Sequence, residues 1–229
     1  MNVRSLVYIS LTCLSLFGSV SLCSKIYSHK TDRQQVVFFG SSHIHNPNHP
    51  QYKKMKKTFN SFIESSIAGN KVILIEGNSH QTNREASEKH VIRYGADKDF
   101  ASFLGAQHAI PVANADIKKN TLIKTLLKNH SLETVYAWSK KTLTTMWNRF
   151  ESQDRPSFES YVTTYLDKWF TNIDVKNCNA SHSHKIDFNT INAAALKIRQ
   201  KYTFTVIQKY WNQGYDIFIV YGAKHAQSH

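Results

Sequence analysis

Two apolar segments, one near each end of the chain, run into the same short motif. Val36–Phe39 is followed by a Gly-x-x-His that ends at His43, and Asp216–Tyr221 is followed by a second one that ends at His225. Short apolar runs rich in β-forming residues predict buried strands, and a glycine directly after a strand permits a turn or a close approach. We therefore expect both histidines to lie just beyond strand ends, where a parallel sheet opens toward a cleft.

The segment from residue 36 to residue 75 predicts a strand–helix–strand unit. Apolar residues recur at helical spacing between Gln51 and Ala68, with lysines on the opposite face, and Gly69-Asn70 ends the helix. Lys71–Ile75 predicts the second strand, which runs directly into Glu76. Short joints between strand, helix and strand indicate a right-handed unit with parallel strands.

The rest of the chain predicts more helices than strands. Glu85–Tyr94 and Asp97–His108 predict two helices that are interrupted at Gly95, and Ile110–Ala115 predicts a strand that Pro111 weakens. Helical patterns then cover most of residues 118–213 and precede the last strand. These patterns predict an α/β fold: a mostly parallel sheet with flanking helices and a large helical insertion before its last strand.

The first residues have the pattern of a secretory signal peptide. Arg4 precedes an apolar run from Leu6 to Phe17, and small residues follow at cleavage spacing. We expect residues 1–23 to be removed and residues 24–229 to form one exported domain, periplasmic or secreted. Cys23 leaves membrane association through a lipid open, although the leucine before it is not the small residue that normally precedes a lipidated cysteine.

Charge and cysteine content narrow the class of protein further. The formal net charge is +13, but the lysines are scattered along helices and no nucleic-acid-binding motif accompanies them. We expect a basic solvated surface and no nucleic-acid partner. Beyond the leader and Cys23 the body of the chain has only Cys178, so a disulfide framework is excluded apart from a single Cys23–Cys178 pair. The polar neighbours of Cys178 favour a bystander thiol over a nucleophile.

Four predicted strands are each followed at once by a residue that can bind a metal or move a proton. The carboxyl ends of parallel strands meet at one edge of a sheet, so we expect these residues to lie together. Imidazoles with carboxylates suit a divalent metal such as zinc, manganese, cobalt or iron(II). Each residue alone is also compatible with a loop or capping role. The four residues are His43, Glu76, Asp116 and His225.

Other histidines carry a weaker signal. His182 and His184 lie in a polar loop and favour a surface position, whereas His45 and His49 lie close to the first motif in a loop of unknown path. The short zinc-binding pattern His-Glu-x-x-His is absent from the sequence.

The order of these motifs resembles the TraB/Tiki superfamily, which is related to erythromycin esterase-like proteins and to haem-binding ChaN-like lipoproteins. Paired Gly-x-x-His motifs, an intervening glutamate and an arginine upstream of the second motif are its hallmarks. Here the glutamate is Glu76, in Ile-Glu-Gly, and the arginine is Arg199. The resemblance covers about residues 36–225.

The resemblance implies a metal-dependent hydrolase, peptidase-like or esterase-like, that acts on a peptide or a small ester. His43 and His225 would be metal ligands or acid–base groups, Glu76 a ligand or general base, and Arg199 a group that steadies a carboxylate or an oxyanion. Two positions depart from the family pattern. Ala96 stands in place of a glutamate, which removes a carboxylate, and Asp116 stands in place of a Glu-Pro pair.

Two other functions stay open at this point. A haem or iron carrier would take axial ligands from tyrosines and histidines of the helical insertion, and haem would then give a Soret band. A degenerate member of the family would bind a partner without turnover. The sequence leaves the substrate, the metal and the oligomeric state undetermined.

Overall fold

The computed structural model describes residues 25–77, 87–148, 156–175, 178 and 187–223. The elements in chain order are β1 (Ile26–Lys30), β2 (Gln35–Ser41), α2 (Pro50–Glu64), β3 (Lys71–Ile75), α3 (Glu88–Gln107), β4 (Val112–Asn114), α4 (Lys119–Leu126), α5 (Leu132–Trp147), α6 (Phe158–Trp169), α7 (Phe188–Asn212) and β5 (Asp216–Gly222). In this part of the chain no helix is long and apolar enough to cross a membrane.

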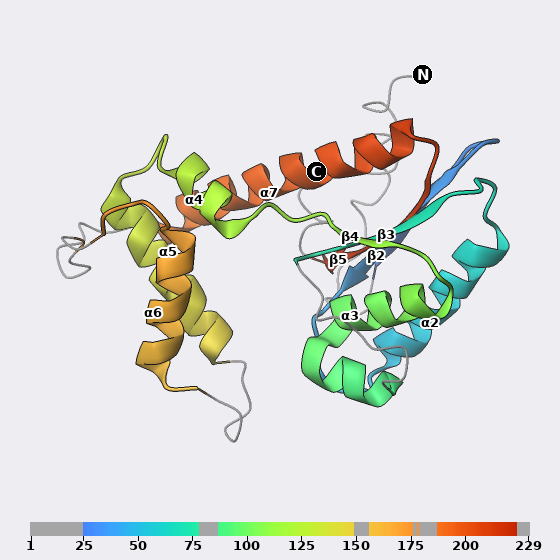
Figure 1. Cartoon of the computed structure of the whole chain (residues 1–229), viewed down its shortest axis with the longest axis horizontal. Helices are drawn as coiled ribbons and strands as arrows, with labels where there is room; N and C mark the ends of the chain where they lie inside the picture. Colours follow the sequence, from blue (N-terminus) through green and yellow to red (C-terminus); the bar gives the residue numbers. More distant parts are fainter. Residues whose placement is uncertain (1–24, 78–86, 149–155, 176–177, 179–186, 224–229) are drawn as a thin grey trace, which may run out of the picture. The chain divides into compact units, whose positions relative to one another are not determined.

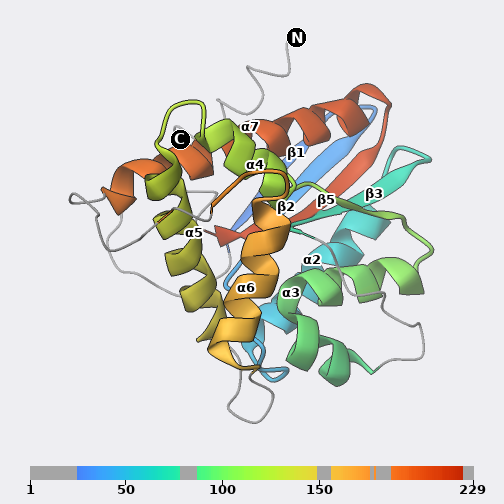
Figure 2. The ribbon, with the colours of Figure 1, turned by 60° about the vertical axis from the view of Figure 1, so that its left-hand side comes forward.

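The strands form one sheet in the order β1-β2-β5-β3-β4, with β1 antiparallel and the other neighbours parallel. The last strand lies in the middle, where Val36 pairs with Ile217 on one side and Lys71 pairs with Asp216 on the other. Figure 2 shows β1, β2, β5 and β3 side by side. The predicted α/β fold is confirmed. All four parallel strands therefore end at the same edge, which we call the carboxyl edge.

Helices cover both faces of the sheet (Figure 1). On one face, α2 and α3 bury aromatic and aliphatic residues against alternate side chains of the strands, with Phe59 and Phe62 packed on Phe218. On the other face, the carboxyl half of α7 packs against the strand residues that point the opposite way, such as Ile217 and Ile219. β5 is buried along its whole length because helices lie above and below it.

The residues before the first predicted strand form a strand of their own, β1, which the sequence pattern did not predict. β1 pairs with β2 over five residue pairs, from Ile26–Phe39 to Lys30–Gln35. Its residues alternate between exposed and half-buried. The sequence signal is weak because an edge strand needs few apolar residues, and polar ones such as Lys30 suit an exposed edge.

Residues 117–201 form a second compact unit, separate from the unit of residues 1–116 and 202–229. Its core is built from apolar faces of α4, α5, α6 and the first part of α7. Ser131 and Ser157 cap α5 and α6 by accepting hydrogen bonds from backbone N–H groups in the first turn. Trp138 donates from its indole to Asn192 at 2.6 Å. The helical insertion before the last strand is confirmed.

Element boundaries agree with the sequence except at a few positions. The helix predicted to reach Ala68 ends at Glu64, and the strand predicted over residues 110–115 keeps only Val112–Asn114. The two helices predicted on either side of Gly95 form one element, α3, with a non-helical residue at Ala96. The predicted break is therefore one residue away from its observed position.

Candidate functional site

His43 lies just past the end of β2, at the carboxyl edge. Its backbone has φ 51°, in the left-handed region that favours glycine, and its N–H donates to the Ser41 hydroxyl at 3.2 Å. The loop that follows is held by α2: the hydroxyl of Tyr52 donates to the carbonyl of Ile44, and Gln51 accepts from the N–H of Ser42. The turn thus places the imidazole at the strand end, with 39% of the side chain exposed.

A kink in α3 supplies the first partner of His43. Ala96 has φ 53° and ψ −141°, a conformation that costs a non-glycine residue on the order of 1–3 kcal/mol. The next residue, Asp97, is fully buried, and its Oδ1 lies 2.9 Å from His43 Nδ1. Backbone strain persists where the surrounding structure over-determines it, and here it accompanies a buried carboxylate in contact with a half-exposed imidazole.

Glu76 is the second partner of His43. It follows β3 directly, and its Oε2 lies 3.4 Å from His43 Nε2. The same oxygen accepts a hydrogen bond from the backbone N–H of Gly222 at 2.9 Å. Because β5 lies between β2 and β3, the glycine of the second Gly-x-x-His motif fixes the carboxylate that faces the histidine of the first motif.

The two carboxylates change the acidity of the imidazole. Burial by itself lowers the pKa of His43, but the hydrogen bonds and charges of Asp97 and Glu76 outweigh it and raise the pKa to about 10. A cation between two anions is thus the favoured state of this ring at neutral pH.

One buried oxygen of the site has no hydrogen-bond partner within the described residues. It is Oδ2 of Asp97; the amide nitrogen Nε2 of Gln51, next to the same loop, is likewise unpartnered. Buried polar groups without partners are costly, so such groups are concentrated where function requires them.

The donor set fits one half of a divalent-metal site. Two ligand atoms held about 2.0–2.1 Å from a tetrahedral zinc ion lie about 3.3 Å apart, close to the 3.4 Å between His43 Nε2 and Glu76 Oε2. Asp97 holds the opposite ring nitrogen, as carboxylates do behind metal-bound histidines. Asp97 cannot bind the same ion, and no group of three potential ligands occurs among the described residues.

Of the other predicted site residues, Asp116 and Arg199 lie among the described residues. Asp116 follows β4, beyond β3, and its N–H donates to the Asn114 side chain; it does not complete a metal-binding group among the residues described. Arg199 is half-buried on α7 in the second compact unit, whereas His43 belongs to the first. His225, together with His182 and His184, lies outside the described residues.

Two residues with intermediate signals have structural roles. Nδ1 of His45 hydrogen-bonds to the carbonyl of Arg93 at 2.9 Å, and His49 caps α2 by accepting from the N–H of Gln51 at 3.3 Å.

Burial raises the pKa of the Cys178 thiol, which disfavours the thiolate that a nucleophile needs.

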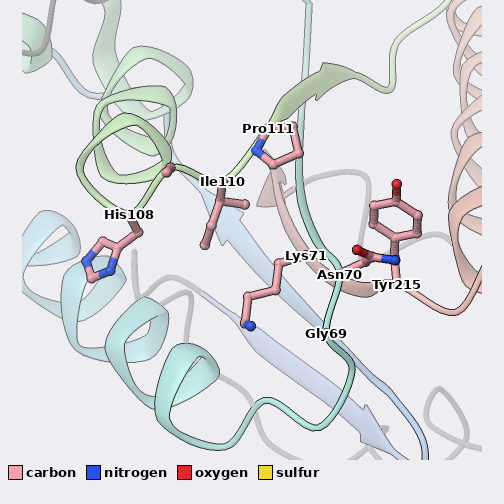
Figure 3. Close-up of a pocket in the computed structure, with 8 residues that line it drawn as sticks. Gly69, Asn70, Lys71, His108, Ile110, Pro111 and Tyr215 are labelled. Atoms are coloured by element: carbon pink, nitrogen blue, oxygen red, sulfur yellow. The ribbon is translucent and has the colours of Figure 1, made fainter.

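A hollow at the opposite edge of the sheet does not share this chemistry (Figure 3). It lies where β3 and β5 begin, and Lys71, His108 and Tyr215 reach it from three separate segments. Its eight lining residues include no carboxylate, so it lacks the pairing of an imidazole with a carboxylate that His43 makes.

The sequence did not predict Asp97 or the Gly222 N–H as parts of the site. The departure at Ala96 indicated a lost carboxylate, yet the carboxylate of the next residue contacts His43. The one sequence signal for Asp97 was the predicted break at Gly95. The first residue after a kink in a helix can direct its side chain differently from the rest of the helix.

Comparison of the chain with protein-family models, with curated proteins and with solved structures gives no match.

Proposed function

We propose that the protein is an exported metal-dependent hydrolase that acts on a peptide or a small ester. The observation that carries this proposal is His43 between two carboxylates, with Asp97 at 2.9 Å on one ring nitrogen and Glu76 at 3.4 Å from the other. The site lies at the carboxyl edge of a parallel sheet, where α/β folds place their ligands.

Each residue around His43 has a separate role in the proposed site. Asp97 accepts the Nδ1 proton of His43, which leaves the Nε2 lone pair directed toward Glu76 when the ring is neutral. The Gly222 N–H holds Glu76 Oε2 in place. His225 would supply the third ligand. When bound, a divalent ion would supply Lewis acidity toward a carbonyl group or a water molecule.

Elemental analysis of the purified protein tests the proposal directly. We expect about one zinc, manganese, cobalt or iron ion per chain, and at least a tenfold lower content in the variants His43→Ala, His225→Ala and Glu76→Gln. His45→Ala is the matched control, because that imidazole lies two residues away but hydrogen-bonds to the Arg93 carbonyl. Hydrolysis of 4-nitrophenyl acetate and of a mixed fluorogenic peptide set should follow the metal content.

Two outcomes would reject the proposal. An equal metal content in wild type and in all three site variants would show that these residues do not bind the metal. A Soret band on addition of haem, with no hydrolysis by the metal-loaded protein, would favour the haem-binding alternative instead.

A further inference from the structure

The outer face of α2 carries a dense group of lysines. Lys53, Lys54, Lys56 and Lys57 are all exposed, while the opposite face buries Tyr52, Met55, Phe59 and Phe62. The helix has no acidic residue in its first turn, and Glu64 is its last residue. Lysines three and four positions apart repel one another along a helix surface. The four lysines therefore repel one another, and no carboxylate in the same half of α2 offsets this repulsion.

The neighbouring part of α3 extends this positive surface. Lys89 and Arg93 are exposed there, and the ion pair between Lys56 and Glu88 joins the two helices. Among the described residues no ion pair engages Lys53, Lys57, Lys89 or Arg93. We call the six cations of α2 and α3 the cationic face. Counted with Glu88, the acidic residue that contacts Lys56 in the described part of the chain, the six cations give a net charge of about +5.

We propose that the cationic face docks the protein on an anionic phospholipid surface. Lysine ammonium groups on long apolar stems bind headgroup phosphates as point charges and need no fixed geometry. Each lysine held near an anionic leaflet raises partitioning about fivefold, and the contributions of several accumulate. A leader at residues 1–23, as the sequence predicts, would bring the chain to a membrane.

The composition of the face favours lipid over nucleic acid. Proteins that hold single strands place aromatic side chains between their cations so that bases can stack. The aromatic residues of α2 are instead all buried in the core beneath the lysines, where Phe59 and Phe62 contact Phe218. Tyr94 on α3, beside Arg93, is exposed, and a tyrosine also suits the headgroup region of a membrane. A group of exposed lysines over a closed apolar core suits a charged lipid surface.

The cationic face lies next to the site around His43, and this placement holds whatever reaction the site performs. Arg93 accepts, through its backbone carbonyl, the hydrogen bond from His45, two residues beyond His43. Asp97 lies four residues further along α3. Docking through the face would bring the carboxyl edge close to the lipid headgroups.

Sedimentation with lipid vesicles tests the proposal, and the protein is used in its mature form, as purified after export. The vesicles contain phosphatidylcholine with either one-third phosphatidylglycerol or none, in 50 mM and 500 mM salt. The variant Lys53→Gln/Lys54→Gln/Lys57→Gln is compared with Lys118→Gln/Lys124→Gln/Lys128→Gln, which removes the same charge from exposed positions in and around α4. We expect the first variant to bind the anionic vesicles about 100-fold more weakly than wild type and the second to change less than tenfold.

The wild-type measurement alone can also overturn the proposal. Binding to the anionic vesicles should exceed binding to the neutral ones and should weaken in 500 mM salt. No preference for the anionic vesicles, or an equal loss in both triple variants, would reject the cationic face as a lipid-binding surface. Binding of a 20-base single-stranded DNA oligonucleotide at physiological salt, without binding of the vesicles, would reject it as well.

Discussion

Asp216 and Asp97 are both fully buried carboxylates, but they lie at opposite edges of the sheet and have very different partners. Asp97 contacts His43, and its second oxygen is unpartnered within the described residues. Asp216 accepts four hydrogen bonds of 2.6–3.2 Å, from the backbone N–H groups of Gln35, Ile67 and Ala68 and from the hydroxyl of Ser66. One edge is saturated with hydrogen bonds that join β2, β5 and the end of α2. At the other edge, a buried carboxylate oxygen of Asp97 has no hydrogen-bond partner within the described residues, so it could accept a hydrogen bond from a ligand.

The largest effect on stability is expected at the saturated edge. Asp216→Asn would place an amide NH₂ group against donors that now meet a carboxylate oxygen. We expect the free energy of unfolding to fall by about 3 kcal/mol. Urea denaturation followed by circular dichroism measures this change. A loss below about 1 kcal/mol would show that the network of Asp216 is dispensable and would remove the contrast between the edges.

At the other edge, Asp97→Asn should affect metal binding more than folding. We expect zinc affinity, measured by competition with a chelating dye, to fall 10–100-fold because the Nδ1 proton of His43 loses a charged acceptor. The loss of stability should be less than half of that in Asp216→Asn. Asp167→Asn, an exposed carboxylate on α6, removes the same charge and should leave zinc affinity unchanged. Equal zinc affinity in Asp97→Asn and wild type would contradict the role given to Asp97.

The metal-free protein should lose stability at high pH through His43. The pKa of this imidazole is raised from 6.5 to about 10 in the folded state, so its contribution is complete below pH 6.5 and disappears as the pH rises through about 10. We expect roughly 1–2 kcal/mol, since a side chain that is two-fifths exposed is partly screened by water. Urea denaturation in the presence of a chelator, for wild type and His43→Gln, isolates the effect. A constant difference between them from pH 6 to pH 10 would be evidence against it.

The smallest effect is expected where α7 meets the carboxyl edge. The hydroxyl of Thr203 donates to the Ala115 carbonyl at 2.9 Å and lies 3.1 Å from the Tyr221 hydroxyl. Thr203→Val keeps the shape and removes this link, so we expect a loss of at most about 1 kcal/mol. Thr121→Val, at an exposed position of α4, is the control for the threonine-to-valine change itself. A larger loss would mean that the carboxyl edge depends on hydrogen bonds as strongly as the edge at Asp216.

The parts of the fold set by local pattern could be predicted from the sequence. The strand Lys71–Ile75 has the predicted bounds, because a buried strand between two neighbouring strands has little freedom in pattern or register. The pairing of His43 with Glu76 also followed from strand ends alone, since parallel strands share one edge. Periodicity and topology together were sufficient for these features.

Features that depend on backbone geometry or on packing between distant segments could not be predicted. Asp97 reaches His43 because of one non-helical residue, and no residue pattern encodes that torsion. β1 is a strand because β2 offers a free edge, and its own sequence is too polar to show it.

The central place of β5 has a consequence for how the chain folds as it is made. β1 can pair with β2, and β3 with β4, as soon as each is synthesised, but these two ribbons have no common hydrogen bonds until the final strand enters between them. Everything in between, including the helical unit, must be translated first. A nascent chain stalled before residue 216 would expose two unpaired ribbon edges, which are places where a strand of another chain can pair and start aggregation.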